Sequence, residues 1–165
     1  MEVVTMIQLT QKETLLLKDL KSHEELCIVK YNDYASKAQD PQLKEMFNKH
    51  AQQEQEHLTS LNTILSGKVP NTQQNAGNQS TNTNNTSSQN IATTAQSNVN
   101  SPEDGNLCRD LLMTEKYVSG SYNISIFEFR DTNIRQTLNH IQKEEQQHGE
   151  DLFNYMQSKG MYTPQ

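Results

Sequence analysis

The chain has 165 residues, a net charge of −6 and a mean hydropathy of −0.88, which is low for a globular domain. No apolar run approaches the roughly 18 residues of a membrane helix, and Met1–Leu9 lacks the basic start and cleavage site of a signal peptide. Nucleic acids and anionic membranes bind basic surfaces, so the acidic balance argues against both as partners. We expect a protein made in the cytoplasm without membrane insertion, whose Cys27 and Cys108 are reduced thiols.

Most of the polarity lies in one segment. From Asn71 to Ser101, 25 of 31 residues are Asn, Gln, Ser or Thr, and none is charged. Such a composition cannot bury enough apolar surface to fold, so we predict a disordered, low-complexity linker. The chain then divides into an N-terminal tail (1–9), helical hairpin 1 (10–67), the linker (68–100), helical hairpin 2 (101–160) and a C-terminal tail (161–165).

The first hairpin has clear helix start and stop signals. Thr10 can cap a first helix, with Glu13 as its capping-box partner, and this helix should run to about residue 39. Asp40 followed by Pro41 starts a second helix, which should end at Gly67. Two long helices joined by so short a turn form an antiparallel hairpin.

The second hairpin has helix start and stop signals of the same kind. Ser101-Pro102 starts a third helix, which breaks at Arg130-Asp131, where Asp131 can cap a fourth helix that ends at Gly160. The sequence therefore predicts an all-α four-helix bundle made of two antiparallel hairpins.

The two hairpins are repeats of one another. With an offset of 91 residues, Glu24 falls on Glu115, and the Glu-x-x-His motif ending at His57 falls on the motif ending at His148. Apolar residues follow 3,4 spacing along all four helices. The ionisable Glu and His residues that interrupt these stripes are Glu24, Glu54, His57, Glu115, Glu145 and His148, together with His50.

These six repeated residues should meet at one level of the bundle, because Glu24 and Glu54 are about equally far from the turn near residue 39. Four buried, unpaired carboxylates cost several kcal/mol each. Two divalent cations would balance their charge and leave the imidazoles as nitrogen ligands. Carboxylate and imidazole ligands suit iron first and manganese second. The alternative is a metal-free polar layer in which protonated carboxylates bond to His and Tyr.

For the remaining polar residues, packing or solvent exposure is the simpler expectation. Tyr31 and Tyr122 could donate hydrogen bonds to the ligands, but core packing is the simpler expectation. His50 is expected to be a half-buried histidine rather than an outer ligand. The pairs Lys143-Glu144 and Glu150-Asp151 are expected on exposed faces, with Glu144 as an alternative to Glu145.

The six-residue pattern resembles the ferritin-like superfamily, and Glu24…Tyr31…Tyr34-Ala-Ser-Lys-Ala38 is similar to the first helix of rubrerythrin-type proteins. The segment Asp110…Tyr122-Asn123 and the tail Asn154–Pro164 resemble the spore coat protein F family. The ferritin-like resemblance implies that Glu24 and Glu115 are terminal ligands, that Glu54 and Glu145 bridge two metals, and that each histidine binds one.

The spore coat resemblance implies a structural and protective component of the bacterial spore coat, with other coat proteins and a homo-oligomer as partners. We therefore expect a spore coat protein with a buried dinuclear iron or manganese site. The alternative is a di-iron or di-manganese oxidase or peroxidase acting on O₂ or peroxide.

Overall fold

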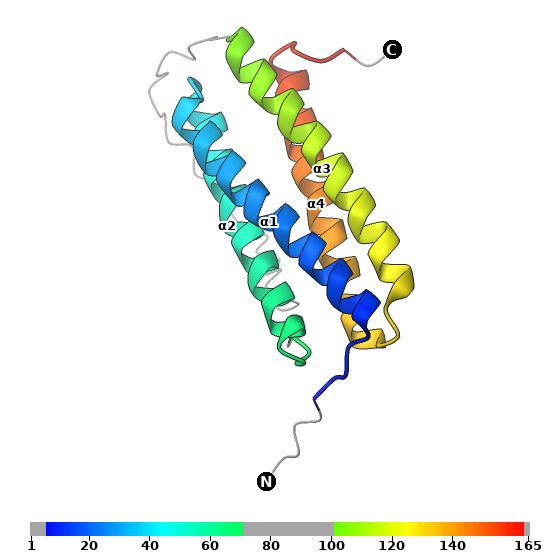
Figure 1. The fold of residues 1–165 in the computed structure, drawn as a ribbon. Coiled ribbons are helices and arrows are strands. Elements are labelled where there is room, and N and C mark those ends of the chain that lie inside the picture. Colours follow the sequence, from blue (N-terminus) through cyan, green and yellow to red (C-terminus); the bar gives the residue numbers. More distant parts are fainter. Residues whose placement is uncertain (1–5, 71–100, 164–165) are drawn as a thin grey trace, which may run out of the picture.

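The computed structural model describes residues 6–70 and 101–163. Within them the chain forms four helices and no strand: α1 (Gln11–Lys37), α2 (Pro41–Leu65), α3 (Pro102–Glu128) and α4 (Thr132–Ser158). α1 packs along α2, and α3 along α4 (Figure 1). The prediction of a four-helix bundle built from two hairpins is confirmed. The predicted disorder of the linker concerns residues 71–100, and these lie outside the described residues.

The predicted helix boundaries depend on caps that the structure shows directly. Thr10 and Glu13 form a reciprocal capping box at the start of α1. The Asp40, Ser101 and Asp131 side chains each accept backbone N–H hydrogen bonds at the start of the next helix. Gly67 follows α2 with φ of 78°, a left-handed conformation that glycine adopts without steric cost. Because these signals are local, the predicted helix boundaries lie within two or three residues of the observed ones.

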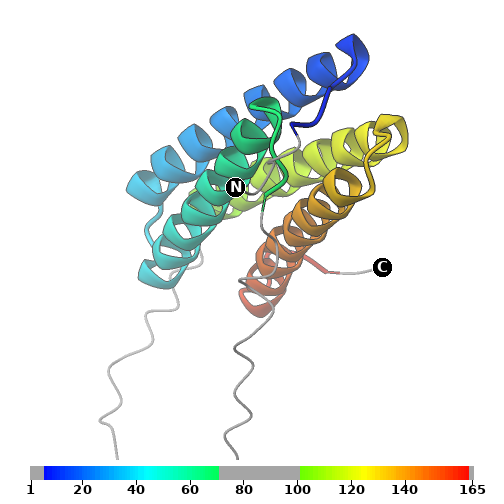
Figure 2. The same ribbon diagram turned by 90° about the horizontal axis from the view of Figure 1, so that it is seen from below.

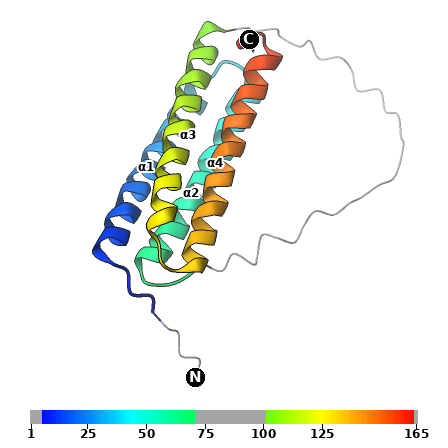
Figure 3. The same ribbon diagram turned by 90° about the vertical axis from the view of Figure 1, so that its right-hand side faces the viewer.

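The helices run α1 up, α2 down, α3 down and α4 up in the view of Figure 1. The end of α2 therefore lies at the opposite end of the bundle from the start of α3. A helix of 27 residues such as α1 is roughly 40 Å long at about 1.5 Å per residue. α1 and α3 lie side by side and run in opposite directions (Figure 3).

The two hairpins hold each other's turns with equivalent acidic residues. Glu13 of α1 accepts the backbone N–H of Arg130, in the α3–α4 turn, at 3.0 Å. At the other end, Asp104 of α3 accepts the backbone N–H groups of Gln39 and Asp40, in the α1–α2 turn, at 2.9 and 3.0 Å. Glu13 and Asp104 are related by the same offset of 91 residues as the repeated motifs. The repeat therefore includes the contacts between the hairpins as well as the helices.

The bundle core consists of two apolar clusters with a polar layer between them (Figure 2 shows the four helices around this core). One cluster, around Leu20 and Ile134, lies toward the α3–α4 turn, and the other, around Phe47 and Cys108, lies toward the α1–α2 turn. Ile7 and Leu9 pack against the first cluster, so this part of the N-terminal tail contacts the bundle. None of the described helices has the length and apolar character to cross a bilayer.

Candidate metal centre

Each helix contributes one glutamate to the polar layer, and α2 and α4 each add a histidine one turn later. None of these side chains is more than 2% exposed. They are the six residues that the sequence repeat singled out: Glu24, Glu54, His57, Glu115, Glu145 and His148. The structure brings all six together, because equal distances from each turn place the glutamates of a hairpin at one level.

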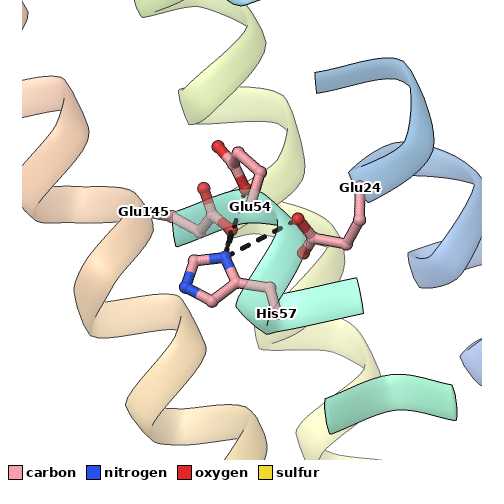
Figure 4. Close-up of side chains that lie close together, drawn as sticks. All are labelled: Glu24, Glu54, His57 and Glu145. Carbon is pink, nitrogen blue, oxygen red and sulfur yellow. Dashed lines mark hydrogen bonds and ion pairs between the residues drawn. The ribbon is translucent and has the colours of Figure 1, made fainter. Parts of the chain in front are cut away.

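The first group of candidate ligands surrounds His57 (Figure 4). Its Nδ1 atom lies 3.1 Å from a Glu54 oxygen, 3.0 Å from Glu145 and 3.6 Å from Glu24. One potential ligand atom from each residue lies within 4.8 Å of all the others. Three carboxylates and one imidazole nitrogen therefore face a common point.

The second group surrounds His148 in the equivalent way. Its Nδ1 atom lies 3.2 Å from Glu54, 3.5 Å from Glu115 and 3.6 Å from Glu145. Glu54 and Glu145 belong to both groups, whereas Glu24 belongs only to the first and Glu115 only to the second. The same arrangement would be needed if two carboxylates bridged two metal ions and two others each bound one ion.

The outer nitrogen of each histidine is held by the opposite hairpin. His57 Nε2 lies 2.8 Å from a carboxylate oxygen of Glu144, and His148 Nε2 lies 3.2 Å from the amide oxygen of Gln53. Both partners are acceptors, so each Nε2 donates its hydrogen. In the neutral tautomer this leaves the Nδ1 lone pair directed at the carboxylates, as a metal ligand needs.

The expectation that Glu144 and Asp151 lie on exposed faces is wrong. Both are half-buried, because each satisfies a histidine on α2: Glu144 contacts His57, and Asp151 contacts His50 Nε2 at 3.0 Å. His50 is fully buried instead of half-buried, and its ring stacks on His148 with centroids 4.2 Å apart. Glu145, rather than its alternative Glu144, faces Nδ1 of both histidines.

The two buried tyrosines cross from one hairpin to the other. Tyr31 of α1 donates a hydrogen bond to Glu115 of α3, and Tyr122 of α3 donates one to Glu24 of α1. Burial raises the pKa of both phenols well above the usual value, and the adjacent carboxylates add to this effect. Both tyrosines therefore stay protonated donors and serve more than core packing.

In the metal-free cluster, bound protons compensate the negative charges of the carboxylates. Burial raises the pKa of Glu24 and Glu115 well above the usual value, and the Glu145 carboxylate raises it further. Burial would also raise the pKa of Glu54 and Glu145, but both imidazoles outweigh it and lower the pKa. The surrounding carboxylates overcome the effect of burial on His57 and His148 and raise their pKa, that of His148 to about 12. Two carboxylates thus face two imidazolium ions.

Hydrogen bonding within the cluster is nevertheless incomplete. Buried carboxylate oxygens of Glu24, Glu54, Glu115 and Glu145, and Nδ1 of His148, have no hydrogen-bond partner. Buried polar atoms are almost always satisfied, and these carboxylate and imidazole atoms could be satisfied by a metal ion. Oxygen and imidazole donors without thiolate fit iron or manganese. The burial of Cys27 and the nearby carboxylates raise its pKa far above the usual value and keep its thiol protonated.

Fold and site together define the chain as a four-helix bundle protein with a buried carboxylate–histidine centre. Residues 103–165 match the family model of the Coat F domain. The second hairpin with its tail is therefore similar to the Coat F domain, which bears out the resemblance to the spore coat protein F family and supports a spore coat protein. No curated protein and no solved structure matches the chain.

Proposed function

We propose that this protein is a protective component of the bacterial spore coat whose bundle holds two divalent metal ions, iron in preference to manganese. Glu24 and His57 would bind one ion and Glu115 and His148 the other, with Glu54 and Glu145 bridging as in ferritin-like proteins. The observation that carries the proposal is the pair of overlapping ligand groups, which share two carboxylates and contain unpartnered oxygen atoms.

Hydrogen bonds within the chain would hold the candidate ligands in position in the metal-free protein. Tyr31 and Tyr122 fix the terminal carboxylates by hydrogen bonds, and Glu144 and Gln53 fix the histidine rings. The apolar clusters on both sides exclude water along the bundle axis. Bound iron or manganese would supply redox chemistry toward oxygen species, and other spore coat proteins would be the partners.

The test is the metal content of the protein purified without chelator and after anaerobic Fe(II) addition. We expect about two ions per chain, and none in Glu54→Ala or Glu145→Ala, because each change removes an oxygen donor from both ligand groups. Glu56→Ala is the matched control, since Glu56 is an exposed glutamate on the same helix. A wild-type chain that takes up no metal, or variants that load fully, would refute the ligand assignment.

Thermal unfolding gives a second readout. A metal that binds only the folded state stabilises it by about 2.7 kcal/mol at 100 times its dissociation constant. We expect chelation to lower the melting temperature of the wild type and to leave that of Glu145→Ala unchanged.

A peroxidase or oxidase is the second candidate function, favoured by a pocket that reaches two of the candidate ligands. Consumption of H₂O₂ or O₂ by the metal-loaded protein would distinguish an enzyme from a structural metal protein.

A further inference from the structure

A surface pocket of about 510 Å³ opens between α3 and α4 beside the candidate metal centre. Glu115 and Glu145 belong to its lining although they are 2% and 0% exposed, so they form its floor. The rim is polar and includes Lys116, Asn123 and Gln146. The pocket therefore ends against two buried glutamates on one side of the cluster.

The pocket exists because hairpin 2 has small residues where hairpin 1 has large ones. Ser119, Gly120 and Gly149 line it, and at the equivalent positions, 91 residues earlier, hairpin 1 has Ile28, Val29 and Leu58. A Cβ atom at Gly120 would meet no atom within 4 Å, and one at Gly149 would meet only Leu112, at 3.6 Å. Neither glycine has positive φ. These glycines are therefore not required by the backbone, and they leave space open.

Hydrogen bonding differs between the buried end of the pocket and the two helices that border it. One oxygen of Glu115 and both oxygens of Glu145 have no hydrogen-bond partner. The Gln142 side chain of α4 donates to the backbone oxygen of Ser119 on α3 at 2.9 Å, which ties the two walls together. The residue equivalent to Gln142 in hairpin 1 is Ala51, whose side chain has no donor for such a bond.

We propose that this pocket is the binding site through which a small oxygen- or nitrogen-donor molecule, of the size of hydrogen peroxide, reaches the metal centre beside Glu115 and Glu145. The inference rests on the proposed metal site. The volume far exceeds the roughly 30 Å³ that one water occupies, so a small molecule fits beside the two glutamates. At the equivalent positions of hairpin 1, the larger Ile28 and Leu58 side chains are half-buried.

Azide is the probe, because this small nitrogen donor binds Fe(III) and then gives a visible charge-transfer band, so the iron-loaded protein is first oxidised in air. Gly120→Leu should narrow the mouth of the pocket and should fold, since leucine forms helices better than glycine. We expect full iron content in this variant and an azide association rate at least tenfold slower. Val29→Leu is the matched control, because it enlarges the exposed equivalent residue of hairpin 1 and should leave the rate unchanged.

The outcomes separate the two proposals. Full iron content with an unchanged azide rate in Gly120→Leu would overturn the pocket and leave the metal site intact. A wild type without iron would overturn both proposals. If Gly120→Leu loads iron poorly, Gly149→Leu decides the question, with the same slower association expected and the same unchanged rate counting against the pocket.

Discussion

Glu144 and Gln53 occupy equivalent positions in the two hairpins, each directly before a shared glutamate, yet they differ in charge. The Glu144 carboxylate holds His57 Nε2 at 2.8 Å, whereas the Gln53 amide holds His148 Nε2 at 3.2 Å. A carboxylate makes the imidazole it contacts a stronger donor to a metal. His148 also stacks on His50, while hairpin 2 has Ile141 at the position equivalent to His50. The two halves of the centre are therefore inequivalent.

The first prediction follows from this asymmetry. In Glu144→Gln both histidines contact an amide, so we expect the affinity of the His57 half for metal to fall by roughly 10-fold or more, as for other outer-shell partners. Stepwise titration with Co(II) or Fe(II) measures the two affinities. Glu150→Gln is the control on the same helix, since Glu150 is exposed and binds only Gln147. Two unaltered binding steps in Glu144→Gln would contradict the prediction.

Metal binding should release protons. Burial raises the pKa of Glu24 and Glu115, and the surrounding carboxylates raise the pKa of His57 and His148, so all four groups hold a proton more firmly in the metal-free protein. Each of these four groups must lose its proton to become a ligand. Two divalent ions thus replace up to four protons, so affinity should rise with pH.

Calorimetry in buffers of different ionisation enthalpy counts these protons. The sign is fixed by the pKa directions, because groups that hold a proton in the metal-free protein compete with metal more strongly as the pH falls. An affinity that is independent of pH between about 6 and 8 would mean that these groups are already deprotonated. Glu54 and Glu145, whose pKa is lowered, contribute no released proton.

The sequence predicted the helices and the six clustered residues because both depend on local spacing. Caps such as Thr10 with Glu13 act within one turn, and the Glu-x-x-His spacing places both side chains on one helix face. The outer contacts depend instead on how the hairpins face each other. Glu144 was expected to be exposed because it lies in a charged pair, but the offset of 91 places it opposite Gln53, beside the shared glutamates. That alignment was the available signal.

The tyrosine contacts could not be read from one helix. Tyr31 lies two turns from Glu24 along α1 and bonds instead to Glu115. This pairing arises because α1 and α3 are antiparallel, so that Tyr31 is level with Glu115 where Tyr122 is level with Glu24. The helix signals within one hairpin do not say how the second hairpin is oriented against the first.

The tyrosine contacts give the next prediction. Tyr31→Phe and Tyr122→Phe each remove the donor of a buried carboxyl group, at a cost of about 1–3 kcal/mol of unfolding free energy in the metal-free protein. Urea denaturation measures this loss. Tyr117→Phe is the control, because Tyr117 lies on α3 with 66% exposure. Should the buried and exposed variants be equally stable, the two hydrogen bonds contribute nothing to folding.

The contact between Glu13 and the α3–α4 turn gives the last prediction. Burial opposes ionisation of Glu13, but the Arg130 guanidinium and the amides of Thr10 and Arg130 lower its pKa to about 2. Because the folded pKa lies below the usual value of 4.5, the stabilisation is complete above pH 4.5 and is lost as the pH falls toward 2. Glu13→Gln should therefore destabilise the protein at pH 7 by about 1–2 kcal/mol.

The pH dependence distinguishes this contact from simple packing. The stability difference between Glu13→Gln and wild type should shrink as the pH falls from about 5 to 2, because the wild-type carboxylate becomes neutral. Denaturation at several pH values measures it, with the exposed Glu56→Gln on α2 as control. A difference that stays constant over this range would show that the charge of Glu13 does not hold the turn. The equivalent Asp104 should then be tested as Asp104→Asn, since it holds the α1–α2 turn by two backbone bonds.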